Sequence, residues 1–256
     1  MLALVSPAKK LDFGADAPLE MFTQPMFQGQ SQALIDVLRA MPKSRLKALM
    51  GLSDNLTDLN YERYQNYQTP FDLSNAKQAV YAFRGDTYVG LDVDSLSAED
   101  VGYAQEHLGI LSGLYGVLRP LDLIQPYRLE MGTGLATSEG ENLYDFWGAQ
   151  LAQKIEAMVS DHKDKTVICL ASNEYIKAVP VKALGVPFVT CHFKEVKNGT
   201  PKTVGIFAKR ARGMMARFMI KNKVETPEGL KDFDIDGYGY ESTLSDDKNL
   251  VFIRNS

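Results

Sequence analysis

The chain has 256 residues, of which 45% are apolar and 23% charged, and its formal net charge is −4. These proportions are ordinary for a soluble globular protein, and no apolar run is long enough to span a membrane. Because the net charge is negative, the surface as a whole does not suit nucleic acid. A nucleic-acid contact would therefore need a local basic patch. Since no stretch has the composition of a linker, we expect one compact domain over residues 1–256.

The first elements combine a buried strand with two lysines. Residues 1–5 form an apolar run that predicts an interior strand, and Lys9 and Lys10 follow shortly after it. The charges come after the apolar run, which is the reverse of a secretory signal, and we therefore expect a cytoplasmic protein. Apolar residues at helical spacing predict a helix over 31–40.

Residues 43–64 predict two short helices separated by a glycine turn. Gly51 and Ser53 lie in that turn, and Arg63 lies on the last turn of the second helix. The layout is similar to a helix-hairpin-helix element, in which backbone N–H groups hold a DNA phosphate without reading bases. Methionine and serine stand where that element prefers proline and a second glycine. An αα-hairpin packed on the core, with Ser53 or Asp54 as N-cap, is therefore the alternative.

Two further elements follow before the centre of the chain. Residues 79–83 and 87–91 flank Arg-Gly-Asp at 84–86 and predict a β-hairpin with a glycine turn. Residues 97–108 begin with a capping-box pattern and predict a helix.

The segment 111–134 is unusual because it is apolar although four glycines and two prolines interrupt it. No long regular element can run through it. It contains Arg119, Arg128 and Glu130. A semi-buried guanidinium needs a partner, which can be Glu130, Asp122 or an external phosphate. Glu130 is also the candidate general acid or base.

The second half of the chain predicts a long helix, a buried strand and a polar loop. Apolar residues recur at helical spacing over 142–162, and residues 166–171 are strand-like. Asn173 and Glu174 follow that strand, at the position where α/β proteins bind ligands. The same two residues also suit a helix N-cap and first turn, so we keep both interpretations.

A hairpin and a basic helix complete the predicted elements. Asn-Gly at 198–199 predicts a hairpin between strands 188–196 and 203–207. Residues 208–223 predict a helix with six positive charges and no acidic residue, and Gly213 within it allows a close backbone approach by a neighbour or ligand. A helix that faces solvent usually carries both positively and negatively charged side chains. Either carboxylates such as Asp232 and Asp234 neutralise this helix, or it meets a polyanion.

Metal and redox chemistry find little support in the sequence. Cys169 and Cys191 lie in apolar, strand-like surroundings and are expected to be buried thiols. The three histidines show no metal-ligand spacing, so no metal or cofactor is expected. The alternating aspartates of 232–236 would share one face of a strand and could bind iron, although a solvated turn is favoured there.

Several motifs together resemble the bacterial YaaA family of peroxide stress proteins. They are SPAK at 6–9, LSGLYGVLRPLDLIQPYRLEMG at 111–132, LASNEY at 170–175 and AKRARGMM at 208–215. The matches span almost the whole chain. The resemblance implies a role in surviving hydrogen peroxide and keeping free intracellular iron low, with DNA binding by members of the family. It implies no firmly assigned reaction.

The sequence therefore favours a mixed α/β (α+β) fold in which helices flank a mixed sheet. Our leading hypothesis is a DNA-binding protein of the peroxide stress response that reads backbone shape with little sequence preference. The residues expected to hold phosphates of double-stranded or branched DNA are Lys9, Lys10, Gly51, Ser53, Arg63, Arg119, Arg128, Lys209, Arg210, Arg212, Arg217 and Lys221. No membrane or obligate protein partner is expected.

Two alternatives remain. One is an enzyme acting on a small phosphorylated or nucleobase-containing substrate, with Glu130 as acid or base, Arg119 and Arg128 as an anion clamp, and Asn173 and Glu174 in a ligand loop. The other is direct iron binding by the aspartates of 232–236.

Overall fold

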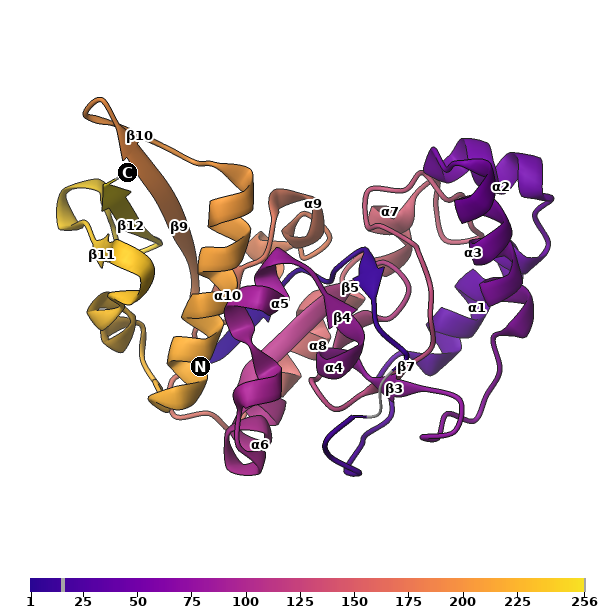
Figure 1. The fold of residues 1–256 in the computed structure, drawn as a ribbon, viewed down its shortest axis with the longest axis horizontal. Coiled ribbons are helices and arrows are strands. Elements are labelled where there is room, and N and C mark those ends of the chain that lie inside the picture. The colour runs from indigo at the N-terminus through magenta and orange to yellow at the C-terminus, as the bar shows by residue number, and fades with distance from the viewer. Residues whose placement is uncertain (15–16, 256) are drawn as a thin grey trace.

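A mixed eight-stranded sheet forms the centre of the fold in the computed structural model, which describes residues 1–14 and 17–255 (Figure 1). The strand order is β11-β12-β9-β8-β1-β5-β6, and β10 pairs with β9 alone. The strands are β1 (Leu2–Val5), β5 (Leu108–Ser112), β6 (Gly116–Leu118), β8 (Val167–Leu170), β9 (Phe188–Lys197), β10 (Thr200–Lys202), β11 (Tyr238–Tyr240) and β12 (Asn249–Asn255). The five strands from β12 to β5 are parallel, whereas β6, β10 and β11 pair antiparallel. The predicted mixed sheet is confirmed.

Strands β1 and β8 run side by side through the middle of the sheet. All their residues are buried, as their continuous apolar runs predict. Val5 is in register with Leu170, so the two strands end at the same level. The chain leaves β1 toward β5 on one side and leaves β8 toward β9 on the other. This reversal is a topological switch point, where α/β sheets bind ligands beyond the carboxyl ends of their strands.

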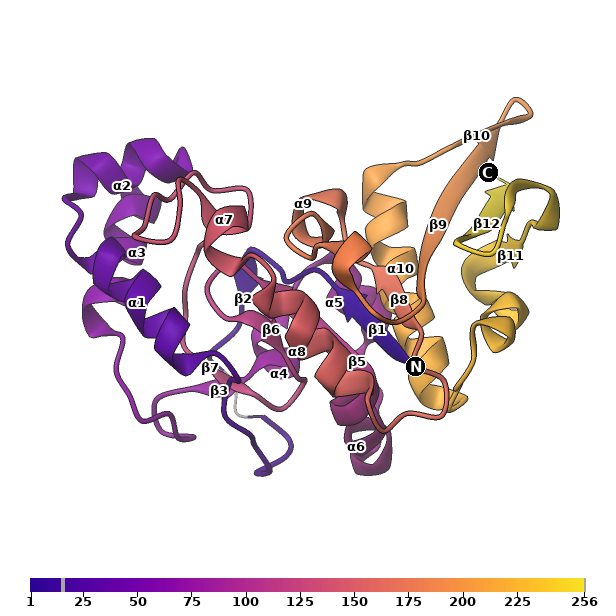
Figure 2. The ribbon, with the colours of Figure 1, turned by 180° about the vertical axis from the view of Figure 1, so that it is seen from behind.

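Helices cover both faces of the sheet. Helices α5, α6 and α10 lie on one face (Figure 1), and α8 lies on the opposite face (Figure 2). The helices are α1 (Gln28–Arg39), α2 (Lys43–Met50), α3 (Asp54–Asn66), α4 (Ala79–Ala82), α5 (Asp86–Leu91), α6 (Ala98–His107), α7 (Leu143–Trp147), α8 (Gln150–Val159), α9 (Asn173–Ile176) and α10 (Gly205–Lys221). Helices α1, α2 and α3 lie at the end of the long axis away from β9 and β12 (Figure 1).

Short elements complete the architecture. Two small ladders pair β2 with β4 and β3 with β7. Their bounds are β2 (Lys10–Leu11), β4 (Phe83–Arg84), β3 (Lys77–Gln78) and β7 (Leu123–Ile124). The 3-10 turns are η1 (Val93–Ser95), η2 (Val181–Ala183), η3 (Pro227–Asp232), η4 (Ile235–Gly237) and η5 (Ser242–Leu244).

Helices α5 and α10 cross at very close range because each contributes a glycine to the crossing. A Cβ on Gly213 would lie 1.8 Å from the carbonyl oxygen of Thr87, and one on Gly90 would lie 2.1 Å from that of Arg210. The close approach expected at Gly213 is therefore made by a neighbouring helix. The crossing holds α5, from Thr87 to Leu91, against the middle of α10.

The β-hairpin predicted over 79–91 is wrong. Residues 79–82 form the buried helix α4, and Asp86 opens helix α5. The short strand β4 pairs instead with β2, far away in the sequence. Helix α5, which was expected to be the second strand, packs instead against α10, a tertiary contact that local patterns do not reveal.

Two other boundaries also differ from expectation. The single helix predicted over 142–162 is broken into α7 and α8 because Gly148 adopts a positive φ of 44°. The turn at Asn198 and Gly199 is confirmed, with φ of 53° and 73°, but the strand predicted over 203–207 is wrong. Strand β10 ends at Lys202, and α10 already begins at Gly205.

Candidate functional site

The loops that follow β1 and β8 are tied together at the switch point. The Ser6 hydroxyl donates to Ser172 Oγ over 3.3 Å, and the Ser172 N–H donates to Ser6 Oγ over 2.9 Å. Tyr88 of α5 adds a third tie, since its hydroxyl donates to the Ser6 carbonyl oxygen over 3.2 Å. Ser172 also stands at the N-cap of α9, so the expected N-cap Asn173 is instead its first residue.

A hollow of about 640 Å³ opens over these tied loops, and we call it the strand-end cleft. It is built by the two loops, by residues 84–88 and by the first half of α10. Its lining residues are Ser6, Pro7, Ala8, Lys9, Lys10, Arg84, Gly85, Asp86, Thr87, Tyr88, Glu130, Ser172, Asn173, Glu174, Tyr175, Lys209 and Arg212. Five of them are basic and three are acidic, so the cleft offers both signs of charge to a ligand.

Glu130 connects the apolar segment 111–134 to the cleft. Its Oε2 lies 2.7 Å from Lys9 Nζ, and its Oε1 lies 3.5 Å from Arg128 Nη2. Glu174 accepts a hydrogen bond from the Gly132 N–H over 3.1 Å, which ties the same segment to α9. Glu130 is therefore shared between two cations.

Arg212 faces the cleft with a charge that the fold does not neutralise. Within residues 1–14 and 17–255 it forms no ion pair, and its buried Nε has no hydrogen-bond partner. Burial lowers the pKa of Arg212, and the thiols of Cys169 and Cys191 act in the opposite direction. Burial raises the pKa of both thiols, so they are neutral at pH 7. Both cysteines are buried and unpaired, as predicted.

Arg119 lies outside the cleft and is satisfied within its own loop. Its Nη2 lies 3.1 Å from Oδ1 of Asp122, a fully buried carboxylate that also accepts the Arg119 N–H. Thr23 donates to the same carboxylate over 2.6 Å. Of the partners considered for this arginine, the structure therefore contains the internal carboxylate Asp122.

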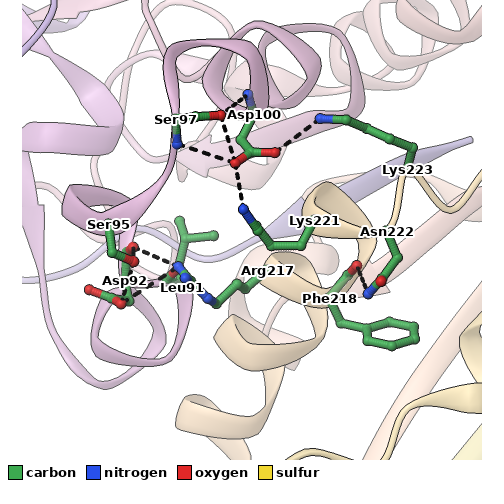
Figure 3. A network of polar contacts seen from close by, with 10 residues as sticks. All are labelled: Leu91, Asp92, Ser95, Ser97, Asp100, Arg217, Phe218, Lys221, Asn222 and Lys223. Atoms are coloured by element: carbon green, nitrogen blue, oxygen red, sulfur yellow. Dashed lines mark hydrogen bonds and ion pairs between the residues drawn. The ribbon is translucent and has the colours of Figure 1, made fainter.

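The second half of α10 is neutralised by the carboxylates of Asp92, which directly follows α5, and of Asp100 in α6 (Figure 3). Arg217 lies 3.6 Å from Asp92, and Asp100 lies 2.9 Å from Lys221 and 3.1 Å from Lys223. The hydrogen bond from Lys221 contributes most to holding the pKa of Asp100 well below its usual range. The helix thus has internal partners, but they are not the Asp232 and Asp234 that the sequence suggested.

Lys209 and Arg210, in the first half of α10, remain exposed. Neither forms an ion pair with any residue in the described part of the chain. Lys209 lines the cleft, whereas Arg210 lies outside it. Exposed cations without partners are the ones that can attract an external anion without first breaking an internal contact.

Helices α2 and α3 form an αα-hairpin with a capped second helix. Gly51 takes the left-handed conformation at φ 60°, and Ser53 caps α3 by accepting the Leu56 N–H over 3.4 Å. Asp54 in the first turn is paired with Lys47 at 2.6 Å, so this helix end already carries an anion. The geometry matches the alternative αα-hairpin, and a helix-hairpin-helix that binds DNA stays a prediction.

Neither Arg63 nor Arg128 lines the strand-end cleft. Arg63 is half-buried beside a separate hollow with Leu11 and Phe13, and burial together with the nearby Arg128 charge lowers its pKa. Arg128 borders a small hollow of about 210 Å³ that shares Glu130 and Glu174 with the strand-end cleft. The structure therefore gathers only part of the predicted set into one place. The cleft contains Lys9, Lys10, Lys209 and Arg212, together with Glu130, Asn173 and Glu174.

Sequence reasoning missed the cleft wall formed by Arg84, Asp86 and Tyr88. These residues belong to the segment mistaken for a hairpin. The available signal was Asp86 directly after a glycine, since an acidic residue favours the first turn of a helix.

Metal and membrane features are not found in the described residues. No group of three or more His, Cys, Asp or Glu side chains within 1–14 and 17–255 is arranged to hold a metal ion. Residues 232–236 run through 3-10 turns rather than a strand, and Asp236 is paired with Arg254. No helix in the same residues is long and apolar enough to cross a membrane.

The fold and the cleft define an α/β protein with a charged cleft at a topological switch point. Comparison with known proteins adds the particular family. The profile described as "Peroxide stress protein YaaA" matches residues 1–244, and the chain belongs to this family. The chain is similar to UPF0246 proteins of Alteromonas mediterranea (50% identity, 100% of this chain and 98% of that one) and Hahella chejuensis (50%, 100% of each). A UPF0246 protein of Bordetella petrii is also 50% identical, over 100% of each chain.

Proposed function

We propose that this member of the peroxide stress family binds the phosphate backbone of DNA, protecting it while free intracellular iron is kept low. The observation that supports this is a group of exposed cations without internal partners. Lys10, Lys209 and Arg210 are exposed and form no ion pair with the described residues. Lys10 and Lys209 line one cleft, and Arg210 adjoins Lys209 on α10. Lower free iron is an indirect effect in this proposal and needs no metal ligand on the chain.

The expected footprint on DNA is small. Arg119, Arg217 and Lys221 already have carboxylate partners, so a phosphate would have to compete for them. Three unpaired cations predict that log K falls with log salt with a slope of about −3. Contacts of this kind carry little sequence information, and affinity should depend weakly on base sequence.

A matched pair of variants tests the DNA proposal. Arg210→Gln removes an unpaired cation and should flatten the salt slope by about one unit. Arg217→Gln removes a cation from the same helix that is paired with Asp92, and should flatten it clearly less. The measurement is duplex affinity by fluorescence anisotropy at several salt concentrations. Equal effects of the two variants, or an unchanged slope for Arg210→Gln, would refute this surface.

A second candidate is an enzyme acting on a small phosphorylated or nucleobase-containing substrate in the strand-end cleft. The observation that favours it is that Asp86, Glu130 and Glu174 line the cleft beside the cations. Carboxylates oppose a simple contact with a phosphate backbone, but they suit acid–base chemistry on a bound molecule. The volume of about 640 Å³ also lies within the range of about 300–1,000 Å³ that is usual for small-molecule sites.

Glu130→Gln separates the two candidates. If the variant keeps its DNA affinity but no longer protects cells from peroxide, Glu130 takes part in chemistry. If both properties survive, Glu130 serves to orient Lys9 and Arg128, which lie 2.7 Å and 3.5 Å from its carboxylate oxygens.

A further inference from the structure

Arg212 lacks both an ion pair and, at its buried Nε, a hydrogen-bond partner among the described residues. Arg63 is also half-buried and forms no ion pair with these residues, but it donates to the Asn60 side-chain oxygen over 3.1 Å. Arg119, Arg128 and Arg217 each have a carboxylate within ion-pair distance. Arg212 is also half-buried, yet no carboxylate of the described residues pairs with it. Its Nε is shielded from solvent and has no hydrogen-bond partner. An uncompensated charge of this kind lowers stability, so its presence needs an explanation outside the unliganded chain.

The guanidinium lies where a ligand can reach it. Arg212 and Lys209 are separated by one helical turn on α10, and both line the strand-end cleft. Positions i and i+3 share one face of a helix. Lys209 is exposed and Arg212 is half-buried, so a ligand meets one cation at the surface and a second one deeper in the cleft. The loops after β1 and β8, tied through Ser6 and Ser172, form the neighbouring wall.

The chemistry of the cations indicates the class of ligand. A guanidinium presents a planar fork of N–H donors that matches two oxygens of a phosphate, and an ammonium adds a point charge beside it. The hollow of about 640 Å³ suits a molecule of nucleotide size. A DNA duplex is too wide to enter such a hollow and would contact only its rim.

We propose that the strand-end cleft binds a small phosphorylated molecule whose phosphate is held by Arg212 and Lys209. This rests on the second candidate function in one respect only, namely that the cleft accepts a small molecule. It requires no turnover, and it shares Lys209 but not Arg210 with the proposed DNA surface. The phosphate of the ligand pairs with Arg212 in place of the missing carboxylate, and its binding should stabilise the folded state.

The test uses the full chain, with inorganic phosphate and pyrophosphate as probes at constant ionic strength. The melting temperature of the wild type should rise saturably with probe concentration. Arg212→Met should bind the probe at least tenfold more weakly, and without probe it should melt at or above the wild-type temperature, because a desolvated charge is gone. Folding of the variant is therefore checked in the same experiment. Arg45→Met, which removes an exposed charge from α2, is the control for net charge.

Other outcomes would overturn the proposal. It fails if neither probe stabilises the wild type at millimolar concentration, or if Arg212→Met binds pyrophosphate as well as the wild type does. It also fails if Arg210→Met weakens pyrophosphate as much as Arg212→Met, because the anion would then bind on the outer surface. A loss of DNA affinity in Arg210→Met with unchanged pyrophosphate binding would support two separate sites. Pyrophosphate binding without any detectable reaction would support this site, because the proposal requires no turnover.

Discussion

Gly213→Ala should destabilise the protein, although alanine is the better helix former. A Cβ at this position would lie 1.8 Å from the Thr87 carbonyl oxygen, against an ordinary contact of 3.4 Å or more. The clash is with backbone, so no side-chain rotation can relieve it. Helices α5 and α10 must therefore separate by about 1.6 Å at their crossing.

The magnitude follows from two opposing effects. Alanine gains about 1 kcal/mol of helix propensity over glycine. Overpacking a close contact costs about 1–3 kcal/mol, and we take the upper end because both clashing groups are rigid. The net loss in the free energy of unfolding should be about 2 kcal/mol, which lowers the melting temperature by about 4–8 °C for a chain of this size.

The assay is urea unfolding at 25 °C together with thermal melting. Gly102→Ala is the matched control, because Gly102 lies within α6 and a Cβ there would meet no atom within 4 Å. That variant should gain up to about 1 kcal/mol. If Gly213→Ala is as stable as Gly102→Ala, the close crossing of α5 and α10 is refuted.

Two further predictions concern buried polar groups. Asp100→Asn should lower the free energy of unfolding by about 2 kcal/mol at pH 7, because Lys221 and Lys223 lose a charged partner. Since the folded-state pKa of Asp100 lies below the unfolded value, its stabilisation is present above about pH 4 and is lost as the pH falls further. Urea midpoints of variant and wild type should therefore converge in acid, and a constant difference would contradict this. Cys169 and Cys191 should not react with a thiol reagent such as DTNB until the protein unfolds, because burial raises the pKa of both thiols. Rapid labelling of the native protein would show that they are accessible thiolates.

Local patterns in the sequence determined much of the secondary structure. The apolar runs of β1 and β8, the capping box of α6 and the Asn-Gly turn after β9 are each specified by a few neighbouring residues. The polar residues after β1 and β8 line one cleft, because parallel strands end at a common edge. The family resemblance carried by these segments is confirmed by the match over residues 1–244.

Only the tertiary structure decided which charges are available to a ligand. The six cations on and after α10 look alike in sequence, yet Lys221 pairs with Asp100, 121 residues away. Arg212 faces a cleft and has no ion-pair partner within the part of the chain that the structure describes. Within the segment 79–91, residues 79–82 and 86–91 likewise form helices, and α5 packs against α10. Pairing and burial depend on contacts between residues far apart in the chain, and patterns read over ten or twenty residues carry no information about such contacts.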